Sequence, residues 1–265
     1  MIVDSHCHAS SRWYQPAESL LFEMDRHGVD KAVLIQLLGA FDNADMIAAR
    51  RAHPDRFAFV AAIPSEALGT NAVWRSVEQG AAGLRLRSSA RAASGEPLSH
   101  WGAAADAGLS ISCVGPAASM IDGSVAMLAE TFPTLTIVLE HLGGLARPDA
   151  GDISAVSGGV LALARWPNVQ IKLPGLGQIA PRKPDLDGDE LPLRLDGVDE
   201  LLRRVIDAFG ADRIMWGSDF PPVAAREGYG HALDWPHQLL APLGETACGA
   251  IFGRTAARSF GLGLP

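Results

Sequence analysis

The chain is poor in cysteine, with only Cys7, Cys113 and Cys248 among 265 residues. They lie far apart and form no CxxC pair, and such an odd, sparse set argues against a disulfide framework. The start of the sequence, MIVDSHCH, also lacks the basic and apolar regions of a secretory signal peptide. We therefore expect a cytoplasmic protein.

Basic residues and long apolar runs are also scarce. The 22 lysines and arginines are outnumbered by 30 aspartates and glutamates, giving a net charge of −8, which argues against nonspecific nucleic-acid binding. No apolar run reaches the roughly 18 residues needed to cross a bilayer, so no membrane association is expected. The apolar share of 48% is too high for a disordered chain. The oligomeric state stays open, a homo-oligomer included.

Short apolar runs rich in β-branched residues alternate along the chain with stretches of helical spacing. Successive runs start roughly 25 to 45 residues apart, which is the size of one βα unit. Strands are predicted at Ile2–His6, Lys31–Ile35, Phe57–Ile63, Gly83–Arg87, Leu109–Cys113, Leu135–Glu140, Val169–Leu173 and Arg213–Trp216. Helices are predicted at Pro16–His27, Ala44–His53, Asn71–Gln79, Ser99–Ala107, Ser119–Thr131, Ile153–Trp166, Val198–Phe209 and Glu245–Ser259.

Eight strand–helix alternations predict a distorted (β/α)₈ barrel, with a doubly wound open sheet as the alternative. No low-complexity linker divides the chain, so residues 1–265 are taken as a single domain. Pro174–Leu195 and Phe220–Trp235 are expected to be long loops at the C-terminal face, where barrel enzymes place their active sites. The loop residues that could reach a substrate are Arg182, Lys183, Arg226 and His231.

Polar residues at strand ends carry the strongest chemical signal. His6 and His8 lie two residues apart in DSHCH, so their side chains point to the same side of the first strand. Two such imidazoles can meet one metal ion or one substrate oxygen. His141 closes the sixth predicted strand and Asp219 follows the eighth. We expect these four groups to converge at one mouth of the barrel.

The motifs DSHCH, EHLGG and WGSDFP together resemble the amidohydrolase superfamily, in its amidohydrolase-related branch of lactonases and decarboxylases. The segment from Ile251 to Leu262 is similar to the final helix of that branch, and the 2-pyrone-4,6-dicarboxylate lactonase subgroup is the most similar in type. The resemblance implies a barrel enzyme acting on a small molecule. It implies His6 and His8 as first-strand ligands, His141 as a polarising residue and Asp219 as the proton-transfer carboxylate.

Departures from that family pattern restrict the metal chemistry. The fourth strand reads GLRLR without the lysine or glutamate of binuclear members, and the fifth reads LSISCV without a histidine. A binuclear centre is therefore not expected. One alternative is a single divalent metal, with zinc as the first candidate, held by His6, His8 and Asp219 with His141 as a further ligand. The other is a metal-free site, as the resemblance to the lactonase subgroup implies. Cys113 is a soft ligand or a small buried thiol.

Arg85 and Arg87 share one face of the fourth strand by the same alternation. If that face is inward, two guanidinium groups line the pocket and bind substrate carboxylates, and otherwise they pair with acids outside it. Lys172, near the end of the seventh strand, is a similar candidate for substrate binding.

We therefore expect hydrolysis of a small acidic lactone or a related ester-like substrate. Asp219 would act as general base, while His6, His8 and His141 polarise the carbonyl, with or without one metal. The alternatives are a metal-dependent non-oxidative decarboxylase of an aromatic or enol acid, and a non-catalytic barrel that binds a small acid.

Overall fold

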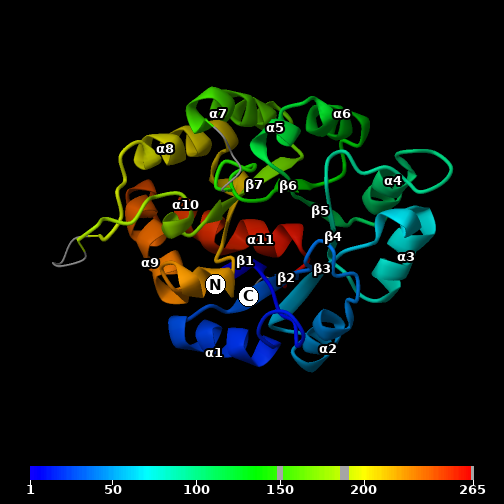
Figure 1. Ribbon diagram of the computed structural model, residues 1–265, viewed down its shortest axis with the longest axis horizontal. Coiled ribbons are helices and arrows are strands. Elements are labelled where there is room, and N and C mark those ends of the chain that lie inside the picture. Colours follow the sequence, from blue (N-terminus) through cyan, green and yellow to red (C-terminus); the bar gives the residue numbers. More distant parts are fainter. Residues whose placement is uncertain (148–151, 186–190, 264–265) are drawn as a thin grey trace.

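Eight short parallel strands form the centre of the computed structural model, which describes residues 1–147, 152–185 and 191–263 (Figure 1). Neighbouring strands are hydrogen-bonded in chain order from the first to the eighth. They are β1 (Val3–Cys7), β2 (Lys31–Ile35), β3 (Phe57–Ala61), β4 (Gly83–Leu86), β5 (Ser110–Cys113), β6 (Ile137–Leu139), β7 (Val169–Pro174) and β8 (Ile214–Gly217).

The chain just beyond β8 returns to β1 and brings the sheet close to closure. The backbone N–H of Asp219 donates to the His6 carbonyl, and that of His8 donates to the Phe220 carbonyl, both at 2.8 Å. The predicted (β/α)₈ barrel is therefore confirmed, and each strand lies within a few residues of its predicted position.

Helices surround the strands (Figure 1). The α-helices are α1 (Ala17–His27), α2 (Ala44–Ala52), α3 (Thr70–Glu78), α4 (Ser99–Asp106), α5 (Ala117–Met120), α6 (Ser124–Thr131), α7 (Ile153–Ala162), α8 (Val198–Phe209), α9 (Tyr229–Leu240), α10 (Glu245–Gly249) and α11 (Thr255–Ser259). The chain between α10 and α11, Ala250–Arg254, is a π-helical segment. Among the helices of the described residues, none is long and apolar enough to span a membrane.

Two predicted segments differ from the structure. The single helix predicted at Ser119–Thr131 is two, because Gly123 adopts a left-handed φ of 97° and the Asp122 carboxylate caps the N–H of Ser124. The predicted loop Phe220–Trp235 contains the first half of α9. Of the other predicted loop, residues 186–190 lie outside the described part of the chain, and Arg182 and Leu193 pair in an antiparallel bridge.

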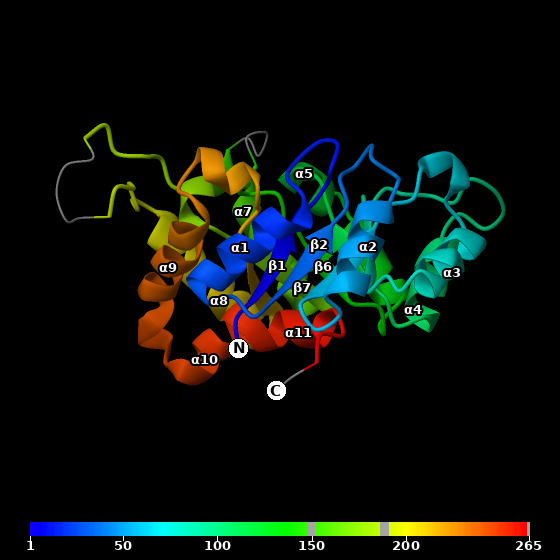
Figure 2. The ribbon, with the colours of Figure 1, turned by 90° about the horizontal axis from the view of Figure 1, so that it is seen from below.

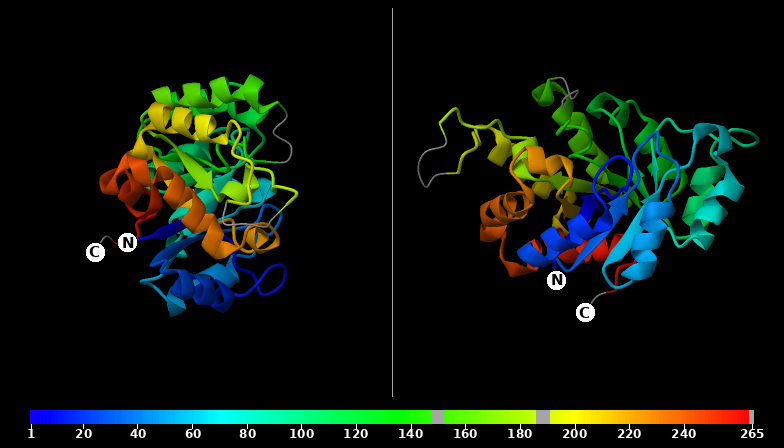
Figure 3. Two further views of the ribbon diagram at one scale, coloured as in Figure 1. Left: turned by 90° about the vertical axis from the view of Figure 1, so that its left-hand side faces the viewer. Right: turned by 60° about the horizontal axis from the view of Figure 1, so that its bottom comes forward.

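The barrel interior has an apolar floor at the end where the strands begin. Alternate strand residues pack there against the last helix and the residue after it: Val3, Val33, Ile35, Ala58, Val60, Val138 and Met215 against Ala256, Ala257 and Phe260. The N-terminus and α11 lie at this end (Figures 2 and 3). Polar side chains are therefore left to the opposite end, where the strands finish.

Candidate active site

The structure brings the four predicted strand-end residues together at the mouth of the barrel. Asp219 Oδ1 lies 3.5 Å from His8 Nε2 and 3.8 Å from His6 Nε2. The ring of His6 is centred 5.1 Å from that of His8 and 4.8 Å from that of His141. His6, His8 and Asp219 are buried, at 3%, 4% and 8% exposure. Their placement allows one small substrate to contact all four groups.

Local backbone features of β8 place Asp219 beside β1. Gly217 allows the approach, because a Cβ there would lie only 2.6 Å from the Cβ of His6. Asp219 itself adopts a left-handed φ of 60°, which aspartate tolerates better than most residues.

A buried carboxylate on β1, which the sequence analysis did not single out, holds the same junction. Asp4 accepts hydrogen bonds from the N–H and hydroxyl of Ser218 and from the hydroxyl of Tyr229. Burial raises the pKa of Asp4, and these hydrogen bonds oppose that rise. Asp4 thereby ties the residue before Asp219 to both β1 and α9.

His141 stands at the start of a left-handed turn after β6. Four consecutive residues have positive φ: 51° at His141, 53° at Leu142, 65° at Gly143 and 86° at Gly144. A Cβ on Gly144 would lie 2.5 Å from the backbone nitrogen of Ala117, so glycine is required there. The EHLGG motif thus turns the chain sharply and leaves the imidazole of His141 next to His6.

A hydrogen-bonded layer of polar side chains lies beneath the histidines. Arg85 pairs with Glu140 through Nε and Nη2, at 3.0 and 2.7 Å to the two carboxylate oxygens. Ser112 donates to Glu140 Oε1 at 2.7 Å, and Lys172 donates to Ser112 at 3.0 Å. Lys172 Nζ also lies 3.1 Å from His6 Nδ1. The predicted residues Arg85 and Lys172 therefore reach the site from within the barrel.

Opposite charges within this layer stabilise each other. Burial alone would raise the pKa of Glu140, but Arg85, then Lys172 and His141, lower it to about 2. Burial lowers the pKa of Lys172 to about 8 against the opposing effect of Glu140, so the amine stays mostly protonated at neutral pH. Both groups are therefore charged inside the barrel.

The groups at the mouth have shifted pKa values as well. Burial and then the charge of Lys172 lower the pKa of His6, and burial lowers that of His141 against the pull of Glu140. The pKa of Asp219 is lowered although burial opposes the shift, because the neighbouring His8, His141 and Arg226 together outweigh burial. The shifts therefore favour neutral rings at His6 and His141 and an ionised carboxylate at Asp219.

Hydrogen bonds to the Nδ1 atoms of His8 and His141 indicate where each neutral ring carries its proton. His8 Nδ1 donates to the Ile35 carbonyl at 2.7 Å, so the neutral form of this ring carries its lone pair on the Nε2 that faces Asp219. Gln178 Nε2 donates to His141 Nδ1 at 3.1 Å, which puts the ring proton of His141 on Nε2. His6 Nε2 is buried and has no hydrogen-bond partner in the described part of the chain.

Within the described part of the chain, two groups of side chains could hold a metal ion: His6, His8 and Asp219, and His6, Glu140 and His141. In the first group, the donor separations of 3.5 and 3.8 Å from Asp219 approach the roughly 3.3 Å that tetrahedral zinc requires. The lone pair on His8 Nε2 also suits a metal, while the Lys172 contact on His6 Nδ1 does not, since ligating histidines normally donate from that nitrogen. The spacing of the donor atoms therefore fits zinc, whereas the Lys172 contact on His6 Nδ1 opposes zinc binding by His6 Nε2.

Arginines line a cavity of about 480 Å³ beside the mouth, with Arg85, Arg87 and Arg91 among its walls. Arg85 is 8% exposed, and its guanidinium is already bound to Glu140 and to the Gln36 carbonyl. Arg87 follows the end of β4 and is exposed. The two predicted arginines therefore face one cavity, but only Arg87 presents its guanidinium to solvent.

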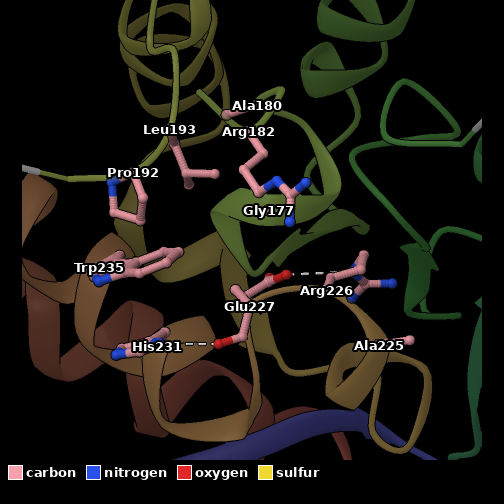
Figure 4. A pocket seen from close by; sticks show the side chains of 10 residues that line it. All are labelled: Gly177, Ala180, Arg182, Pro192, Leu193, Ala225, Arg226, Glu227, His231 and Trp235. Atoms are coloured by element: carbon pink, nitrogen blue, oxygen red, sulfur yellow. Dashed lines mark hydrogen bonds and ion pairs between the residues drawn. The ribbon is translucent and has the colours of Figure 1, made fainter. Parts of the chain in front are cut away.

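A second cavity of about 480 Å³ lies between the segments that follow β7 and β8 (Figure 4). Trp235 and His231 of α9 stack with ring centres 4.5 Å apart and face Pro192 and Leu193 across it (Figure 4). Arg226 lines this cavity and contacts Asp219 Oδ2 at 3.2 Å.

The remaining predicted loop residues occupy the same region. Arg182 and His231 also line the second cavity, whereas Lys183 pairs its backbone N–H with the Pro192 carbonyl. Thus three of the four lie along a cavity that borders Asp219 through Arg226.

Cys113 ends β5 and is completely buried, with Sγ 3.9 Å from the sulfur of Met120. Burial raises the pKa of this thiol to about 12, so it is protonated. The side chain is absent from both candidate metal groups found among the described residues.

Comparison with known proteins identifies the family of the chain. The amidohydrolase family profile matches residues 3–262. An L-fucono-1,5-lactonase from Burkholderia ambifaria is 36% identical over 143 residues, which are 52% of this chain and 45% of that protein. The chain therefore aligns with less than half of that relative's length.

Solved structures share the whole fold. A protein from Pseudomonas putida, proposed to be a 2-pyrone-4,6-dicarboxylic acid hydrolase, superposes with a TM-score of 0.76 at 20% identity, covering 100% of this chain and 98% of its own. An amidohydrolase from Burkholderia multivorans, solved with bound zinc, has a TM-score of 0.77 at 19% identity, covering 99% of this chain and 100% of its own. At such identities the similarity establishes the fold alone.

Proposed function

Because the chain belongs to the amidohydrolase family, we propose that it hydrolyses the ester bond of a small lactone that carries a carboxylate. The observation that carries the proposal is the pair of acceptors at the mouth. His8 Nε2 and Asp219 Oδ1 lie 3.5 Å apart, and with a neutral His8 ring both atoms present lone pairs. One water molecule can donate its two protons to these atoms and direct an oxygen lone pair at a bound carbonyl.

Asp219 is the general base in this scheme and takes a proton from the attacking water. His141 donates from Nε2 to the carbonyl oxygen as negative charge develops there, and the buried Nε2 of His6 faces the same space. Protonated Asp219 then returns the proton to the leaving alkoxide as the ring opens. The lowered pKa of Asp219 keeps the base ionised at neutral pH.

We assign recognition of the substrate carboxylate to the arginine-lined cavity. Arg87 is the exposed donor and can bind a carboxylate through two N–H groups, while Arg85 adds positive charge from below. Lys172 contributes charge to the same region from inside the barrel, where it is 2% exposed.

The alternative form of the site holds one divalent ion, with zinc as the first candidate and His6, His8 and Asp219 as its ligands. Donor spacing and the zinc-bound structure from Burkholderia multivorans support this form. A bound ion would supply Lewis-acid polarisation of the carbonyl.

Asp219→Asn tests the proposed reaction. We expect turnover in a screen of lactones and aromatic acids to appear with acidic lactones, and the variant to reduce kcat by about 100-fold or more. Asp199→Asn, in an exposed pair with Arg203 on α8, is the control and should keep full activity. Turnover of the aromatic acids alone would favour a decarboxylase instead. Unchanged kcat in a folded Asp219→Asn variant would exclude Asp219 as the base.

A further inference from the structure

Lys172 connects the floor of the barrel to its mouth. Its ammonium lies 5.5 Å from the centre of the Phe260 ring on one side and 3.1 Å from His6 Nδ1 on the other. The side chain is 2% exposed, so no bulk water replaces these contacts. The neighbouring side chains therefore determine which hydrogen bonds the Lys172 ammonium makes.

Those neighbours specify the direction of each hydrogen bond. Ser112 has one proton and donates it to Glu140 Oε1 at 2.7 Å, so its oxygen accepts from Lys172 at 3.0 Å. An ammonium group has donors and no lone pair. The ring nitrogen that it contacts must therefore present a lone pair, and the proton of a neutral His6 must sit on Nε2.

We propose that Lys172 is a positioning residue that holds His6 in the Nε2–H tautomer, which makes His6 a hydrogen-bond donor to the substrate carbonyl and a poor metal ligand. The role assigned to the donor rests on the proposed function, whereas the tautomer does not. The buried Nε2 without a partner in the described residues is the atom that would meet the carbonyl oxygen.

His8 provides the contrast within the same motif. Its Nδ1 donates to the Ile35 carbonyl, the partner usual for a metal-ligating histidine, so in the neutral ring the lone pair lies on Nε2. Both candidate metal groups include His6, so the state of this one ring decides whether either can be completed. Lys172 thus gives His6 a different tautomer from His8, although the two histidines look equivalent in the sequence.

The first test is the tautomer of His6 in the natural chain. Long-range ¹H–¹⁵N correlation spectra of protein labelled at histidine, recorded at neutral pH without substrate or metal, identify the protonated nitrogen of each ring. The spectrum of a His6→Gln variant assigns the His6 signals. We expect a proton on Nε2 of His6 and on Nδ1 of His8. A proton on Nδ1 of His6 would overturn the proposal.

Variants at position 172 test whether the lysine is the cause. In Lys172→Met we expect the Nδ1–H tautomer of His6 to appear and zinc to bind about tenfold tighter, within the range known for groups that orient metal ligands. Lys172→Arg should retain the natural tautomer and the weak zinc binding. Lys31→Met, at the opposite end of the barrel, is the control and should change neither measurement.

Two results would contradict a causal role for Lys172: an unchanged His6 tautomer in Lys172→Met, or unchanged zinc affinity. If Lys172→Met fails to fold, Lys172→Gln gives the same comparison, and the natural chain's spectrum remains decisive by itself. None of these measurements uses turnover. A lactone screen without activity would therefore reject the proposed function while leaving this proposal to the spectra.

Discussion

Single residues below the histidines determine how the site is charged, and Glu140 is the clearest case. Its side chain is 1% exposed and binds Arg85 through both oxygens. Glu140→Gln removes the charge and leaves a buried guanidinium uncompensated, so we expect a loss of about 3 to 5 kcal/mol in the free energy of unfolding. Urea denaturation measures the loss.

The control for that variant is Glu200→Gln, which breaks an exposed ion pair with Arg203 on α8. Exposed pairs contribute about 0 to 1 kcal/mol, so its unfolding curve should nearly match that of the natural chain. Equal losses in the two variants would show that Glu140 is not an essential partner of Arg85.

The same carboxylate makes stability depend on pH. The pKa of Glu140 is lowered from 4.5 to about 2 on folding, so its stabilisation is complete above pH 4.5 and is lost as the pH falls toward 2. The difference in unfolding free energy between the natural chain and Glu140→Gln should therefore shrink as the pH drops below 4.5. Urea denaturation at a series of pH values checks this, and a constant difference would contradict it.

At the residue scale, the sequence pointed to His6, His8, His141 and Asp219 because polar groups at the ends of apolar strands are conspicuous. Glu140 and Ser112 were missed, although a carboxylate next to His141 at the end of a buried strand requires a partner. The partner of Arg85 could not be read from the sequence, because β4 and β6 are not adjacent. Their side chains meet only inside the closed barrel.

At the scale of elements, the turn after β6 positions part of the site, and four consecutive residues in it have positive φ. Gly144→Ala would place a Cβ 2.5 Å from the backbone nitrogen of Ala117 at a φ of 86°. We expect a loss of roughly 3 kcal/mol or more in unfolding free energy, from positive φ and the backbone clash together. Activity should also fall, because His141 begins the same turn.

Gly108→Ala is the matched control for the turn. Gly108 has a similar left-handed φ of 66°, but nothing lies within 4 Å of the added Cβ. Its loss should be limited to the cost of positive φ, roughly 1 to 2 kcal/mol. Thermal unfolding of the two variants compares them, and similar losses would show that the packing around Gly144 is unimportant.

Strands were easier to predict than helices because buried parallel strands are continuous apolar runs of similar length. No part of helix α9 was predicted, because Gly228 and Gly230 at its start look like loop residues in the sequence. Here α9 packs against the rest of the molecule: Trp216 donates to the Ala232 carbonyl and Tyr229 to Asp4. Tertiary contacts therefore override the local preference.

Over the whole molecule, the net charge of −8 says little about what a substrate would meet. The arginines of the arginine-lined cavity, and Arg226 in contact with Asp219, place positive charge around the mouth. Beneath it, the charged layer of Lys172, Arg85 and Glu140 separates the mouth from the apolar floor. An acidic protein can thus present a site suited to an anionic lactone.

That floor depends on the last part of the chain, which closes the barrel end opposite the active site (Figure 2). Phe260 is 2% exposed there, packs in the interior apolar cluster and lies under Lys172. Phe260→Ala should lower the unfolding free energy by about 3 to 5 kcal/mol, because the cavity it leaves is enclosed by strands and cannot collapse. Phe22→Ala on α1, where the ring is 62% exposed, should cost under about 0.5 kcal/mol. Urea denaturation of both variants measures how much the C-terminal segment stabilises the barrel. Equal, small losses of unfolding free energy in the two variants would show that the strands are stable without Phe260.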